Sequence, residues 1–325
     1  MNSEQDNIMM DTMYWWGVPT LFRCKNDNNI QNCDIGLVGV PHSSGNGTTE
    51  RDQHLGPRAV RNVSAGLRRV HLDFGFNPWK KKIIHDLGDV SLPEANNNEK
   101  CIERISEYYA QIANANKNVV SIGGDHSITG GILQGLCSKE SKLTSSQKVN
   151  LIQFDAHTDT YENLDHFMGS KKSAAHWASY LVRQGNVDAS CSTQIGIRGN
   201  PRTLDWLKPS YDLGYQVITM NDFKEKGHKT CSKMILDKLD NKPIYITFDL
   251  DCLDPTIAPA VANIEPSFKG FSIDEAIKLL HSLKGKNIIG GDVVCLMPTK
   301  DQPNNITAMV AASIMFEIIC LICSN

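Results

Sequence analysis

Short apolar runs alternate with amphipathic segments along the chain. Seven runs rich in β-branched residues are predicted to be strands, at 35–40, 119–122, 150–154, 194–197, 216–219, 244–248 and 288–294. Helical periodicity predicts helices between and after them, at 57–67, 100–115, 129–137, 173–184, 229–239, 273–283 and 306–322. Strands that are apolar nearly throughout and are separated by helices indicate an α/β fold, in which a mainly parallel sheet is covered on both faces.

Composition and charge exclude several classes of protein. The 325 residues carry 33 Lys and Arg against 36 Asp and Glu. This balance leaves no positive excess to neutralise phosphates, so we expect no nucleic-acid partner. No apolar stretch reaches the ~18 residues of a membrane span, so we expect no membrane association. Residues 1–13 lack the basic and apolar regions of a signal peptide, and the ten cysteines are irregularly spaced. A cytoplasmic protein with free thiols is therefore predicted.

Acidic and histidine residues follow four of the predicted strands directly. These loops read Gly-Gly-Asp-His-Ser at 123–127, Asp-Ala-His-Thr-Asp at 155–159, Asp-Leu-Asp-Cys-Leu-Asp-Pro at 249–255 and Gly-Gly-Asp at 290–292. In an open parallel sheet, ligands bind beyond the carboxyl ends of the strands. The four loops are therefore expected to converge on one site.

The spacing within two of these loops favours a metal centre. Asp155, His157 and Asp159 lie two residues apart, as do Asp249 and Asp251, and alternate residues of an extended segment point the same way. Buried carboxylates require cations, and these loops contain no run of Lys or Arg that would provide them.

The number and type of donors indicate two ions. Four aspartates with one or two histidines exceed what one tetrahedral zinc takes, whereas an oxygen-rich set suits six-coordinate Mn, Co, Fe(II) or Ni. Two divalent ions would balance four aspartates, and a bridging hydroxide would make the centre anionic. Such a nucleophile suits a cationic, carbon-centred electrophile. Each short motif alone is common by chance, but three of them at strand ends favour a metal site.

The motifs together resemble those of the ureohydrolases, the family of arginase and agmatinase, and most of all the agmatinases. The resemblance is carried by GPRAVR at 56–61, SIGGDHS at 121–127, FDAHTDTYEN at 154–163, QIGIRG at 194–199 and ITFDLDCLDPTIAP at 246–259. It implies a three-layer α/β/α sandwich, a homotrimer or homohexamer, and hydrolysis of a C–N bond in a guanidinium compound to release urea. It also divides the chain into an N-terminal extension with an aromatic segment, 1–34, and a single catalytic domain, 35–325.

The resemblance also implies a role for each metal ligand. One ion would be held by His126, Asp155, Asp159 and Asp249, and the other by Asp155, His157, Asp249 and Asp251. Asp155 and Asp249 would bridge two divalent ions, Ni²⁺ or Mn²⁺, and Asp159 would carry a proton to the departing nitrogen.

Three departures from the family pattern bear on the substrate. Cys295 stands where relatives place a glutamate that pairs with the guanidinium, and a neutral thiol cannot form that ion pair. His176 is the nearest candidate for the proton-shuttling histidine of relatives, with His166 as the alternative. Thr48 lies in an altered mouth loop, and together with a second bulkier mouth loop at 259–263 it suggests a tight pocket. Trp16, in a Tyr-Trp-Trp segment, is a candidate for stacking on a planar cation.

These features favour free guanidine as the substrate, hydrolysed to urea and ammonia, and they resemble the guanidine hydrolase branch. An agmatinase or guanidinobutyrase remains an alternative, with Glu265 or Glu50 in place of the missing glutamate. Formimidoylglutamate hydrolysis is a further alternative, which would require a basic mouth. A non-catalytic homologue is the last alternative, and the presence of all six ligands argues against it.

Overall fold

A single eight-stranded sheet runs through the computed structural model, which describes residues 13–47, 50–162, 164, 169–201, 203–265 and 270–325. The strands are β1 (Ile35–Val40), β2 (Ile84–Asp89), β3 (Asn118–Gly123), β4 (Asn150–Phe154), β5 (Thr193–Ile197), β6 (Gln216–Thr219), β7 (Ile244–Asp249) and β8 (Ile288–Val294). All neighbouring strands pair in parallel, in the order β2-β1-β3-β8-β7-β4-β5-β6. The expected parallel α/β architecture is confirmed.

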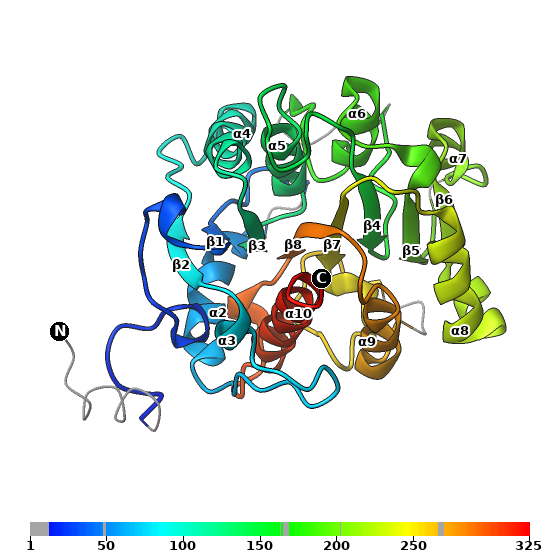
Figure 1. Ribbon diagram of the computed structural model, residues 1–325. Coiled ribbons are helices and arrows are strands. Elements are labelled where there is room, and N and C mark those ends of the chain that lie inside the picture. The colour runs from blue at the N-terminus through cyan, green and yellow to red at the C-terminus, as the bar shows by residue number, and fades with distance from the viewer. Residues whose placement is uncertain (1–12, 48–49, 163, 165–168, 202, 266–269) are drawn as a thin grey trace.

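Helices cover both faces of the sheet (Figure 1). One layer contains α4 (Asn98–Asn114), α5 (Ser127–Leu136), α6 (Trp177–Gln184) and α7 (Lys208–Leu213). The opposite layer contains α2 (Gly56–Ser64), α3 (Pro78–Lys81), α8 (Met220–Lys238), α9 (Ile273–His281) and α10 (Ile306–Ile322). The molecule is therefore the three-layer α/β/α sandwich that the sequence predicts.

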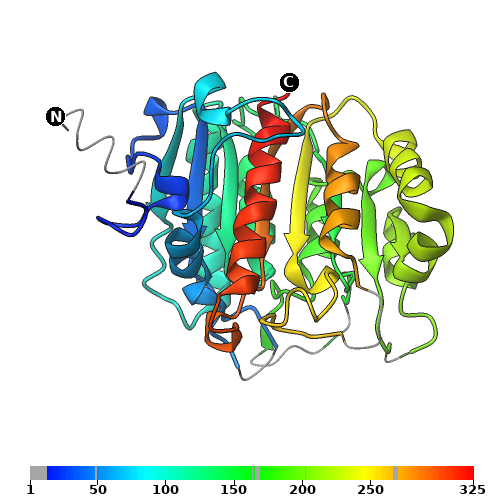
Figure 2. The same cartoon turned by 90° about the horizontal axis from the view of Figure 1, so that it is seen from below.

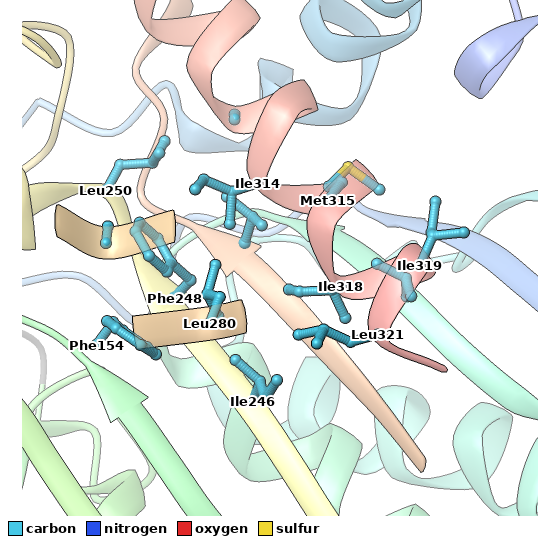
Figure 3. Packing of buried hydrophobic residues seen from close by; sticks show 14 of the residues in the cluster. Phe154, Ile246, Phe248, Leu250, Leu280, Ile314, Met315, Ile318, Ile319 and Leu321 are labelled. Atoms are coloured by element: carbon cyan, nitrogen blue, oxygen red, sulfur yellow. The ribbon is translucent and has the colours of Figure 1, made fainter. Parts of the chain in front are cut away.

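The central helix of the second layer, α10, is apolar around most of its circumference, as expected for a helix buried in a core. Its Ile318 packs over Phe248 and Ile246 of β7, and Leu280 of α9 lies beside them (Figure 3). A Cβ added to Gly291 of β8 would lie 2.6 Å from the Ile246 carbonyl oxygen and 3.1 Å from Ile318. This glycine therefore allows α10 to approach the sheet closely.

The edge strand β2 was not predicted from the sequence, because its residues Ile-His-Asp-Leu-Gly-Asp do not form an apolar run. Its Asp86 is fully buried and accepts two hydrogen bonds from the Arg61 guanidinium, at 2.8 and 2.9 Å, and one from the Leu21 amide. A paired and hydrogen-bonded carboxylate is tolerated in a core. The ion pair with Arg61 of α2 thus allows a polar strand to close this side of the sheet.

Several helix boundaries differ from the predicted ones for local reasons. The helix predicted at 173–184 begins only at Trp177, after a turn. The helix predicted at 229–239 begins nine residues earlier, at Met220, where Thr219 and Asp222 form a capping box, and it is kinked at Gly227. No helix was predicted at the short α7, which carries Pro209 in its first turn.

The N-terminal segment contributes to the core only in part. Tyr14, Trp15 and Trp16 are 48%, 70% and 51% exposed, whereas Leu21 and Phe22 are buried in the same hydrophobic cluster as α10. The division of the chain at residue 34 stays a prediction. No helix in the described residues is both long enough and apolar enough to cross a membrane.

Candidate metal centre

The predicted site lies at the carboxyl ends of the four central strands, β3, β8, β7 and β4. Figure 2 shows these ends and the loops that follow them on one side of the sheet, away from the C-terminus of the chain. His126 precedes α5 directly after β3, and Asp155 follows β4. Asp249 ends β7 and begins a single 3-10 turn, Leu250–Cys252. Strands far apart in sequence therefore bring their loops together.

Three carboxylates surround one histidine nitrogen. His126 Nδ1 lies 3.0 Å from Asp155 Oδ2, 3.1 Å from Asp159 Oδ2 and 3.2 Å from Asp249 Oδ2. All four side chains are buried. The donor atoms therefore enclose a point suited to one ion.

A second group lies directly beside the first and shares Asp155. His157 Nδ1 is 3.0 Å from Asp251 Oδ2 and 3.6 Å from Asp155 Oδ1. The two oxygens of Asp155 thus face different histidines. Asp249 also touches both groups, because its Oδ1 accepts the Asp251 amide while its Oδ2 faces His126. The structure brings the six predicted ligands together, with Asp155 and Asp249 between the two groups.

The chemistry of this donor set fits two divalent cations. His126 Nδ1 is buried and makes no hydrogen bond within the described residues. Burial and the neighbouring carboxylates raise the pKa values of Asp249 and Asp159 above their ordinary range. Carboxylates packed so closely hold protons unless cations neutralise them. Carboxylate oxygens with imidazole nitrogens suit Mn, Fe, Co or Ni.

The two histidines are oriented by partners on the side away from the carboxylates. His126 Nε2 bonds Thr247 Oγ1 at 2.8 Å, and Thr247 in turn donates to the buried Asp292 at 2.6 Å. His157 Nε2 lies 3.2 Å from Glu265 Oε1. Metal-binding histidines are usually fixed in this way through the second nitrogen, which leaves Nδ1 free to face the ion.

A cavity of about 950 Å³ opens above the two groups. His126, His157, Asp159, Asp249 and Asp251 are part of its wall. This volume exceeds what a small cation needs. This volume is that of the whole cavity, which reaches as far as α7, and Thr48 of the first mouth loop lies outside the described residues, so the tight pocket expected from the mouth loops stays a prediction.

Cys295 lies where the sequence suggested, in the cavity wall just after β8. Burial, together with the charges of Asp249 and Asp251, raises the pKa of its thiol well above the ordinary value. Cys295 is consequently a neutral group beside the carboxylates. It cannot supply the charge that a glutamate would provide.

Two other predicted residues, His176 and Trp16, are not brought to the site. His176 does not line the cavity, because its Nδ1 bonds Ser173 Oγ at 2.7 Å and its Nε2 bonds the Leu164 carbonyl at 3.0 Å. Its two neighbours on the N-terminal side, both alanines, line the cavity instead. Trp16 is half exposed and does not line the cavity either. Thr48 and His166 lie outside the described residues.

Two further residues support the site, although the sequence did not mark them as part of a metal centre. Arg198 is buried and donates to the carbonyl oxygens of Asp251, Cys252, Leu253 and Glu265. It therefore holds the loop that carries Asp251. Trp177 donates its indole N–H to Asp159, although in the sequence it reads as an apolar helix residue.

Comparison with known proteins identifies the family. Residues 33–321 match the model of the Arginase family. The chain belongs to the arginase family. It is 33% identical over 307 residues to human mitochondrial guanidino acid hydrolase, an alignment that covers 94% of this chain and 82% of the relative. Chicken mitochondrial agmatinase is 32% identical, with 94% and 86% covered.

The solved structure of proclavaminate amidino hydrolase from Streptomyces clavuligerus superposes on this arginase-family chain with a TM-score of 0.85 at 26% identity. The superposition covers 96% of this chain and 99% of the other. The ureohydrolase resemblance, the arginase-like fold and the expected class, a hydrolase of C–N bonds, are thereby confirmed.

Proposed function

We propose that this arginase-family chain hydrolyses a small guanidinium compound, free guanidine, to urea and ammonia, with two divalent ions held by the six predicted ligands. The observation that carries the proposal is the paired arrangement of His126 and His157 on either side of Asp155. That arrangement supports two adjacent cation positions with carboxylates between them.

In the proposed reaction, water attacks the guanidinium carbon and one amine leaves. The bound ions would supply Lewis acidity and lower the pKa of water. Asp159 accepts a proton from the attacking water and returns it to the departing nitrogen. Burial raises the pKa of Asp159, which favours its taking up a proton. Guanidinium and water thus give urea and ammonium.

The charged groups of the cavity wall argue against a substrate with a carboxylate tail. Arg183 is paired with Glu162, and Lys208 is paired with Asp212. Arg198 is engaged by backbone carbonyls. Among the described residues of the wall these three cations already have partners, which counts against guanidino acids and formimidoylglutamate.

Agmatine is the second candidate, and one observation favours it. Asp205 lines the cavity and forms no ion pair with the described residues. Its carboxylate could receive the ammonium group at the far end of agmatine. Cavity volume does not distinguish guanidine from agmatine. With Cys295 in place of an acid, the site lacks the ion-pair partner that relatives are expected to offer a guanidinium group. This difference favours free guanidine, bound in another way.

The proposal is tested by measuring urea release from guanidine, methylguanidine, guanidinobutyrate, agmatine and arginine, with protein loaded with either Ni²⁺ or Mn²⁺. We expect guanidine to be the best substrate and nickel the better metal. Asp205→Asn serves as a matched control: it should leave guanidine turnover unchanged and lower only that of agmatine. Faster turnover of agmatine than of guanidine by the wild-type chain would contradict the assignment to guanidine.

The homotrimer or homohexamer and the cytoplasmic location expected from the sequence remain predictions. Sedimentation of the purified chain would test the first.

A further inference from the structure

Trp177 contacts two of the proposed metal ligands at once. It is the first residue of α6 and is completely buried. Its indole Nε1 donates to Asp159 Oδ2 at 2.7 Å. Its ring centroid lies 4.7 Å from that of His126, with an angle of 38° between the rings. Within the described part of the chain, Trp177 alone both packs its ring against His126 and bonds a carboxylate of the centre.

The bond from Trp177 is made to an oxygen that also faces the centre. Asp159 Oδ2 lies 3.1 Å from His126 Nδ1. A carboxylate oxygen can accept one hydrogen bond and still direct electron density toward a cation. The indole N–H therefore fixes the direction of Asp159 without occupying the place of an ion.

The backbone of Asp159 also requires support. Its φ of 52° lies in the left-handed region, which is uncommon for residues other than glycine. The Ala178 amide donates to the Asp159 carbonyl at 3.2 Å. Tyr215 in turn donates to the Ala178 carbonyl at 3.0 Å. The start of α6 thus holds Asp159 by both its backbone and its side chain.

We propose that Trp177 is a positioning residue that holds Asp159 in the orientation needed to bind an ion and to transfer a proton. The inference rests on the proposed metal centre. An indole N–H is a donor only, so it stabilises the carboxylate and takes no part in proton exchange itself. Because His176 is turned away from the cavity, the orientation of Asp159 is all the more important for proton transfer.

The test compares Trp177→Phe with Trp79→Phe. The first variant keeps an aromatic ring beside His126 but removes the donor to Asp159. The second is a matched control, because Trp79 Nε1 is buried with no hydrogen-bond partner among the described residues, and its ring packs against Phe316 of α10, across the sheet from α6. Circular dichroism and thermal unfolding of the chelator-treated proteins show whether each variant folds.

Affinity for Co²⁺, measured by competition with a chromophoric chelator, is the first readout. We expect binding by Trp177→Phe to be weaker by about ten-fold or more, the usual effect of losing a group that orients a ligand, whereas Trp79→Phe should match the wild type. Fluorescence is the second readout. Because Trp177 lies against the centre, Co²⁺ should quench its emission in wild type and in Trp79→Phe, and this component should be missing from Trp177→Phe.

The kinetic pattern separates positioning from a general loss of fold. Trp177→Phe should lower kcat more than it raises KM, because Asp159 transfers the proton. Unchanged Co²⁺ affinity and unchanged kcat in a folded Trp177→Phe would overturn the inference and leave the metal centre intact. If the wild type itself bound no Co²⁺, the proposed function would fail as well.

Discussion

Replacing Arg198 should loosen the loop that carries Asp251. The guanidinium donates to the carbonyl oxygens of Asp251 at 2.7 Å, Leu253 at 3.1 Å, Cys252 at 3.2 Å and Glu265 at 3.3 Å. Arg198→Met keeps much of the side-chain volume but leaves four carbonyls short of a donor. Three of the four contacts come from Nη2, which has two hydrogens, so at most three hydrogens are shared among the four carbonyls. At about 1 kcal/mol for each donated hydrogen, the free energy of unfolding should fall by ~3 kcal/mol.

The loss of unfolding free energy can be measured as a fall in the melting temperature, Tm. Unfolding entropy is roughly 2.1 cal/mol/K per residue, which is about 0.7 kcal/mol/K for 325 residues, so Tm should fall by about 4 °C. Differential scanning fluorimetry of chelator-treated protein measures it without a contribution from bound ions. Arg198→Lys, which offers a single ammonium group, should recover only part of the loss.

Urea release by metal-loaded Arg198→Met should also fall, because Asp251 and Glu265 are both attached to this guanidinium through their backbones. A variant that melts within about 1 °C of the wild type and retains full activity would show that the four hydrogen bonds do not stabilise the loop.

Three further predictions concern separate parts of the molecule. Asp249→Asn should reduce urea release by several orders of magnitude and lower the number of ions bound per chain, as measured by elemental analysis; near-normal activity would contradict a bridging role. Arg61→Met should leave the buried Asp86 unpaired and cost about 3 kcal/mol in urea-induced unfolding, and the double variant with Asp86→Asn should recover part of that loss. Burial acts to raise the pKa of Glu317, but hydrogen bonds from two histidines outweigh it and hold the pKa below its usual value. The stability that Glu317 contributes is therefore present above its unfolded pKa of about 4.3 and is lost as pH falls further. Unfolding of Glu317→Gln should depend less on pH between about 5 and 3 than that of the wild type, and identical pH profiles would exclude this contribution.

Much of the fold could be predicted because its strands are buried on both faces. The runs at 35–40, 150–154, 216–219 and 288–294 were predicted with the bounds that the structure shows. β1, β4 and β8 are buried at every position, and such strands are mostly apolar, whereas the edge strand β6 is only partly buried. β2 escaped prediction because its stability depends on Arg61, 25 residues away in sequence, which neutralises the buried Asp86. No local pattern contains that information.

The candidate metal site was accessible from sequence for a related reason. Parallel strands end at one edge, so motifs placed after them converge whatever the details of the loops. The direction of each loop side chain was not accessible. His176 and Trp177 are adjacent in sequence, yet tertiary hydrogen bonds turn the histidine away from the cavity and the indole toward Asp159. The orientation of such side chains depends on hydrogen-bond partners whose positions in space the sequence does not give.

The strand order has a consequence for how the chain matures during synthesis. β7 and β8 are made last, yet they insert between β3 and β4, which are made earlier. A nascent chain that ends before residue 244 therefore has His126 and Asp155 but lacks β7 and β8, which lie between β3 and β4 in the sheet. A cation-binding arrangement with Asp249 and Asp251 can form only when the final third has left the ribosome. Binding of ions by the full set of ligands would thus indicate that the sheet is complete. The strand order alone prevents a half-made chain from forming that set.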